Sequence, residues 1–86
     1  MASIEEVRAG IAAANEHANS ALGAVNQAIN EMEDALGTLM HAVDGSGQAD
    51  ATHSVASWAK AKDNLEEVRQ QISAGISMAE ELAGRL

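Results

Sequence analysis

The stretch Asp44-Gly45-Ser46-Gly47 decides how this chain folds. It opens the only polar, glycine-rich segment of a sequence that contains no proline. Glycine adopts turn conformations that other residues avoid, and such a cluster between two periodic segments marks a chain reversal. We therefore expect a turn at about residues 44–51, built on these four residues, with one long segment on either side of it.

Upstream of the turn, apolar and small residues recur at alternating steps of three and four. The series is Ile4, Val7, Ile11, Ala14, Ala18, Ala21, Val25, Ala28, Met32, Ala35, Leu39 and Ala42. A spacing that averages about 3.5 residues keeps one stripe of a helix facing a neighbouring helix. We expect a helix over about residues 4–43, with Ser3 and Glu6 forming a capping box at its start.

Downstream of the turn the same rhythm returns, at Trp58, Ala61, Leu65, Val68, Ile72, Gly75, Ala79, Leu82 and Leu86. It predicts a second helix over about residues 52–84, capped by Asp50, Thr52 or Ser54 and ended by Gly84. The fold class is therefore all-α: one domain, residues 1–86, forming an antiparallel two-helix hairpin.

In such a hairpin, residues whose numbers add to about 95 lie level with each other. Trp58 then lies level with Gly37, and Ile72 with Gly23. Two interpretations stay open: each large side chain packs onto a glycine, or the glycines thin the outer surface or are simply tolerated there. Trp58 itself is open to two further readings, a core anchor near the turn or an anchor of an intermolecular interface.

A further apolar column in the first helix, at Leu22, Ile29, Leu36 and Val43, widens the stripe beyond one neighbour. A hairpin of this size with an alanine-rich core is also marginal in stability. We therefore expect it to dimerise into a four-helix bundle with itself or a similar helical hairpin. The expected core or interface residues are Val25, Ile29, Met32, Leu36, Leu39, Trp58, Leu65, Val68 and Ile72.

The charge balance excludes several classes of partner. The formal charge is −8, and only five Lys and Arg are present, so phosphate backbones and anionic membranes are repelled. No segment is apolar for long enough to enter a membrane, and the acidic N-terminus lacks the regions of a signal peptide. We expect a cytoplasmic protein, or one exported without a cleaved signal peptide, that binds no nucleic acid.

Candidate catalytic and metal-binding groups are weak. His41 and His53 flank the turn beside Asp44 and Asp50, but no His pair has i, i+4 spacing and no cysteine accompanies them. The carboxylates follow the polar faces of the helices, where no pocket would raise a pKa. We expect no enzyme activity, no catalytic residue, no cofactor and no bound metal.

The turn and the second helix resemble the ESAT-like (Trp-x-Gly) proteins of type VII secretion. The matching stretches are Val43-Asp44-Gly45-Ser46-Gly47, Ser57-Trp58-Ala59, Asn64-Leu65-Glu66-Glu67-Val68 and Ile72-Ser73-Ala74. Two features depart from the family: Val43 replaces the tryptophan of the turn motif, and the Tyr-x-x-x-Asp/Glu export signal is missing. The resemblance implies a bacterial protein that forms four-helix dimers and acts as a secretion substrate, partner or adaptor.

A second interpretation from another class stays open. A chain with two long heptad seams also suits a structural or regulatory coiled-coil protein that assembles into a longer array and has no role in secretion. A discrete dimer favours the first interpretation, and filaments favour the second.

Overall fold

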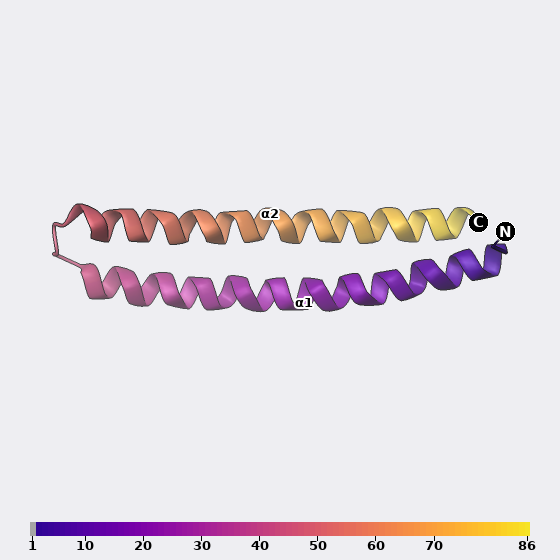
Figure 1. Ribbon diagram of the computed structural model, residues 1–86, viewed down its shortest axis with the longest axis horizontal. Helices are drawn as coiled ribbons and strands as arrows, with labels where there is room; N and C mark the ends of the chain where they lie inside the picture. Colours follow the sequence, from indigo (N-terminus) through magenta and orange to yellow (C-terminus); the bar gives the residue numbers. More distant parts are fainter. Residues whose placement is uncertain (1) are drawn as a thin grey trace.

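Two long helices lie side by side and run in opposite directions (Figure 1). The computed structural model describes residues 2–86, with α1 spanning Ile4–Val43 and α2 spanning Ala49–Arg85. The expected all-α antiparallel hairpin is confirmed. The molecule is a rod of 63 × 18 × 15 Å. Its radius of gyration is 19.3 Å, whereas a compact domain of this length has about 12 Å.

The start of α1 is fixed by Ser3. Its Oγ accepts a hydrogen bond from the Glu6 amide at 3.1 Å, and its carbonyl accepts one from the Val7 amide at 3.0 Å. Glu5 and Glu6 occupy the first turn, where negative charge interacts favourably with the helix dipole. The half of the capping box that Ser3 supplies is therefore formed as expected.

A type II turn ends α1. Asp44 has φ −56° and ψ 127°, Gly45 has φ 76°, and the Ser46 amide donates to the Val43 carbonyl at 2.9 Å. The third residue of this turn needs a positive φ, which glycine adopts without strain. Gly47 also has a positive φ, 69°, and the Ser46 hydroxyl accepts from the Gln48 amide at 3.3 Å.

The ends of α2 differ from the expected ones. Gln48 is the N-cap residue and makes no capping bond with its side chain. Asp50, Thr52 and Ser54 lie inside the helix, and the Ser54 hydroxyl donates back to the Asp50 carbonyl at 2.9 Å. The predicted side-chain cap is wrong, because the tight turn brings the chain into helix by Ala49. Gly84 also lies within α2, so its predicted role as the terminating glycine is wrong.

One column of the predicted α1 seam is wrong as well. The α1 residues that are partly or fully buried are Ile11, Asn15, Ala18, Leu22, Val25, Ala28, Ile29, Met32, Ala35, Leu36, Leu39 and Val43. Leu22, Ile29 and Leu36 therefore face α2, while Ala14 and Ala21 are exposed. Leucine and isoleucine remove more apolar area from water than alanine does, so they take the seam.

The seam of α2 is shifted in the same way. Lys62, Arg69 and Ile76 lie partly or fully buried, whereas Ala61 and Gly75 of the expected column are exposed. Long basic side chains can lay their methylene stems along an apolar seam and keep the charge at its edge. Because Lys62 and Arg69 are charged, their column was not predicted to face α1.

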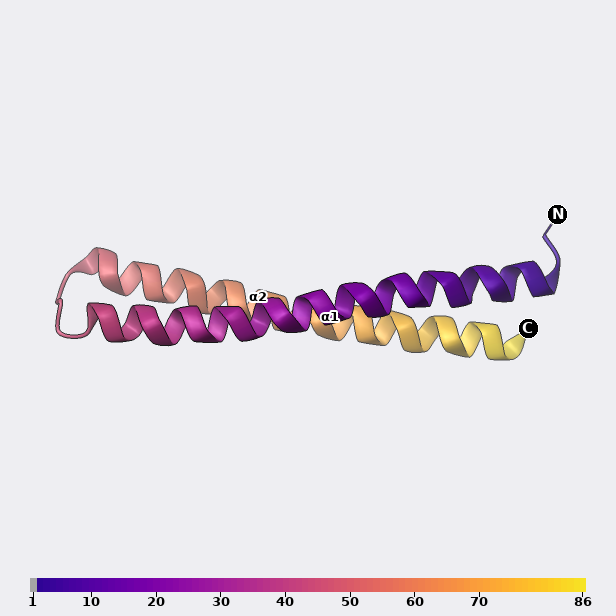
Figure 2. The ribbon, with the colours of Figure 1, turned by 90° about the horizontal axis from the view of Figure 1, so that it is seen from below.

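The predicted alignment of the two helices, in which residues whose numbers add to about 95 lie level, agrees with the structure. Lys62 Nζ lies 3.7 Å from Glu33 Oε1, and these two residue numbers add to 95. Gly23 and Gly37 do not receive large side chains, since a Cβ added at either would meet nothing within 4 Å. The helices cross at a shallow angle near the middle of the rod, and both termini lie at the end opposite the turn (Figure 2).

Candidate interaction surface

The hairpin buries very little of itself. Only Ile29, at 3% exposed, and Ile76, at 9%, are buried among the described residues. The chain exposes 6167 Å², whereas a compact monomer of 8.9 kDa is expected to expose about 4,800 Å². The excess, roughly 1,300 Å², exceeds the ~800 Å² that each partner contributes to a protein–protein interface of ordinary size.

In each helix, one column that was predicted to lie in the seam lies outside it, and both of these columns are on the same side of the rod. Their residues come three positions after the residues of a column that is in the seam, as Ala21 follows Ala18 and Val68 follows Leu65. Antiparallel helices present columns of equal offset on the same face. We call this surface the alanine face; its residues are Val7, Ala14, Ala21, Ala28, Ala35 and Ala42 of α1, and Trp58, Ala61, Val68, Gly75 and Leu82 of α2.

Trp58 belongs to this face although it occupies a seam position. Its side chain is 41% exposed. It borders an open hollow that is also lined by Asp34, Ala35, Thr38, Leu39 and Ala42. The indole therefore lies over the alanine column of α1 rather than between the helices, and the expected core role is only partly met.

The alanine face carries almost no charge. Its outer margins are formed by Gly10, His17, Ala24, Glu31 and Thr38 of α1, and by Ser57, Asn64, Gln71, Met78 and Arg85 of α2. Glu31 and Arg85 are the charged residues among those named; Asp50 lies in the Ser57 column nearer the turn, and Asp34 borders the Trp58 hollow. Of the eight large hydrophobic side chains that are exposed within residues 2–86, five lie on the face or its margins: Val7, Trp58, Val68, Met78 and Leu82.

The opposite side, which we call the polar face, is lined by Asn19, Asn26, Glu33, Glu66, Ser73 and Glu80. Lys62 Nζ reaches it from the seam and lies 3.7 Å from carboxylate oxygens of both Glu33 and Glu66. Arg69 borders a shallow hollow there whose lining includes Asn26 and Ser73 as well as Leu22 and Ala74. The partly buried Lys62 is paired on this face with two carboxylates.

The residues expected in the core or interface divide between the seam and the alanine face. Ile29 is buried; Val25, Met32, Leu36, Leu39, Leu65 and Ile72 are half-buried in the seam. Trp58 and Val68, at 41% and 39% exposed, lie on the alanine face. Ile76 was missed, because its column reads Lys62 and Arg69 on the preceding turns.

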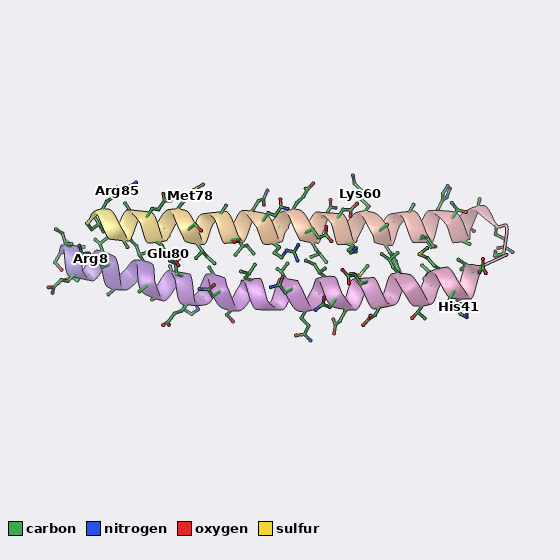
Figure 3. The ribbon with its side chains drawn as sticks, turned by 180° about the vertical axis from the view of Figure 1, so that it is seen from behind. Arg8, His41, Lys60, Met78, Glu80 and Arg85 are labelled. Carbon is green, nitrogen blue, oxygen red and sulfur yellow. The ribbon has the colours of Figure 1, made fainter. Side chains whose placement is uncertain are left out.

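The histidines that flank the turn do not come together. His41 points outward from the rod (Figure 3). His53 is exposed near the start of α2. Within residues 2–86, no group of three His, Cys, Asp or Glu side chains is placed to hold a metal ion. Neither helix is long and apolar enough to cross a membrane.

Comparison of the chain with models of protein families, with curated proteins and with solved structures found no match. The stretches that resemble the ESAT-like family lie in two parts of the hairpin. Residues 43–47 form the end of α1 and the turn, and residues 57–74 lie on α2. The second stretch includes Trp58, Leu65 and Val68, so it contributes to both the seam and the alanine face.

Proposed function

We propose that this protein is a non-enzymatic interaction module whose alanine face binds another helical hairpin to form a four-helix bundle. One observation carries the proposal. A rod 63 Å long leaves an apolar face with few charges open along its length, while only two side chains within residues 2–86 are buried. Monomeric proteins rarely expose contiguous apolar surface on this scale, and such surfaces mark interaction sites.

The small side chains of the face suit a helical partner. Alanine and glycine let helix axes approach towards the short end of the usual spacing of about 8–10 Å. The larger residues, Trp58 and Leu82, stand above this low surface and can enter hollows on the partner. A flat face with a few protruding apolar groups matches another hairpin better than it matches an extended peptide or a small molecule.

For the biological role we propose an ESAT-like substrate, partner or adaptor of bacterial type VII secretion. The support is the resemblance of the turn at Gly45 and of the second helix, together with the hairpin fold. The protein would act in the cytoplasm or leave it without a cleaved signal peptide.

A second candidate is a self-assembling structural or regulatory coiled-coil protein. The open end of the rod favours it, since Ile4 and Leu86 are exposed there and could join rods end to end. In that case the alanine face would pair rods laterally while their ends extend the array.

Native mass measurement over a range of protein concentrations tests the proposal. A discrete dimer that dissociates on dilution is expected. Species that lengthen with concentration would favour the coiled-coil array, and a monomer at every concentration, with no hairpin partner encoded beside its gene, would refute the proposal. Metal analysis and a chelator titration should leave the oligomeric state and the stability unchanged.

A further inference from the structure

We propose that the alanine face is covered by a second copy of this chain, laid antiparallel, with α2 against α2 and α1 against α1. This inference rests on the proposed function and specifies its partner, orientation and register. The arrangement has a twofold axis that crosses the rod near Ile72 and lies in the plane between the two faces. It is supported by steric complementarity along the face and by one pair of hydrogen-bonding side chains.

The α2 column of the face alternates small and large residues: Ala61, Val68, Gly75 and Leu82. Turning the second copy end for end about the axis brings Val68 opposite Gly75 of the second copy. The same rotation brings Leu82 opposite Ala61 of the second copy. Every large side chain of the column therefore meets a small one, and the symmetry repeats each pair twice.

The same rotation brings Trp58 level with a glycine of the second copy. Trp58 lies about as far from the middle of the rod on the turn side as Gly10 lies on the open side. Gly10 is a margin residue of the face, and a Cβ there would meet nothing within 4 Å. Because the indole lies over the alanine column of α1, it faces the stretch between Val7 and Ala14 of the other copy, with Gly10 at its outer margin.

A hydrogen-bonding pair on α1 also matches in this register. Glu31 lies near the middle of the α1 margin, and the rotation places it opposite His17 of the second copy. The two residues occupy the same margin column of α1, so the pair also forms twice. The remaining carboxylates stay on the polar face and the outer sides, where two copies of charge −8 keep them in water.

A face-to-face dimer with both turns at the same end is less complementary. It would lay α2 over α1 of the second copy and bring the two Trp58 side chains together on the axis. It would also place Gly75 over Ala21, leaving a gap. The antiparallel register removes both defects.

Disulfide mapping tests the register, because the chain has no cysteine of its own. Chains carrying Val68→Cys and chains carrying Gly75→Cys are prepared separately, mixed, unfolded, refolded together and oxidised. We expect a covalent dimer that contains one of each, and the same from Leu82→Cys mixed with Ala61→Cys. Val68→Cys alone should not cross-link, since two copies of that residue would be about 10 Å apart along the axis.

The competing orientation predicts a different pair. If the turns lie at the same end, Val68→Cys should cross-link with Ala28→Cys instead, because α2 then faces α1. A dimer that forms only this pair overturns the inference and leaves the proposed function standing. A parent chain that stays monomeric, and forms none of the cross-links, overturns both.

A matched pair of glycine variants tests the same contact without oxidation. Gly75→Leu places a large side chain against Val68 of the second copy, whereas Gly37→Leu places it on the outer side of α1. Within one copy both sites are open, since a Cβ at either meets nothing within 4 Å. We expect Gly75→Leu to raise the dimer Kd about tenfold or more, and Gly37→Leu to leave it unchanged. Equal dimerisation of the two variants would overturn the register.

Discussion

The two long faces of the hairpin are both exposed, but they differ in polarity. The polar face bridges the seam with Lys62, Glu33 and Glu66 and presents amides and hydroxyls to water. The alanine face has the same length and the same helices, but its columns contain alanine, glycine and a few exposed apolar side chains. Burial inside one copy does not explain this difference. The second molecule that we propose on the alanine face would explain it.

The asymmetry also explains which residues form the intramolecular seam. Either of two columns of α1 could face α2: the alanine column or the column of Leu22, Ile29 and Leu36. The larger residues bury more apolar area per turn, so the hairpin uses them. Ala28 and Ala35 lie half-buried at the edge of the seam, and Ala14, Ala21 and Ala42 remain outside. There the low side chains allow close approach of another helix.

The largest expected effect distinguishes the seam from the open end. Ile29→Ala should lower the free energy of unfolding by about 2–5 kcal/mol, because the side chain is 3% exposed and its removal leaves a cavity. Ile4→Ala is the matched control, since Ile4 is 55% exposed and should change stability little. Urea unfolding of both variants gives the comparison. Equal losses would mean that the seam is not where the structure places it.

The second prediction addresses the faces directly. Val68→Glu on the alanine face should weaken dimerisation by about 2–3 kcal/mol, because it buries a charge without a partner. Ser73→Glu is the control; it adds the same charge to the same helix on the polar face. Sedimentation gives the dimer Kd, and circular dichroism checks that both variants keep their helices. If both weaken the dimer equally, general repulsion between acidic chains is responsible and the alanine face loses its role.

The sequence predicted the hairpin because its strongest signals are local. The heptad spacing, the lack of proline and the glycine pair at Gly45 and Gly47 each act within a few residues. The seam was harder, because three apolar columns compete in α1 and a helix pair can use only two. Which two columns face α2 depends on the total apolar area buried between the helices, and a short stretch of sequence does not give that area.

The hidden column of α2 shows a second limit. Lys62 and Arg69 read as surface residues, yet their stems lie in the seam and lead to Ile76. Likewise Asp50, Thr52 and Ser54 are all good capping residues, and the geometry of the turn makes α2 begin before any of them. A residue's capping propensity shows that it can cap a helix, but the backbone before it determines where the helix begins.

A third prediction compares glycines of the turn and of the outer helix surface. Gly45→Ala should destabilise the hairpin by about 1–2 kcal/mol, because φ is 76° at this position. Gly37→Ala should stabilise it by up to about 1 kcal/mol, because the site is helical and open. Thermal unfolding of the two variants should therefore move the midpoint in opposite directions. A shift of the same sign in both would contradict the assigned turn.

The smallest expected effect lies on the polar face. Lys62→Met keeps an apolar stem in the seam but removes the ammonium group from Glu33 and Glu66, each 3.7 Å away. Ion pairs with exposed carboxylates contribute little, so the free energy of unfolding should change by less than about 1 kcal/mol. The difference between variant and parent should also shrink at high salt, which screens the pairs. A loss of several kcal/mol, or any change in dimer Kd, would show that the polar face supports the assembly, and the division between the two faces would then fail.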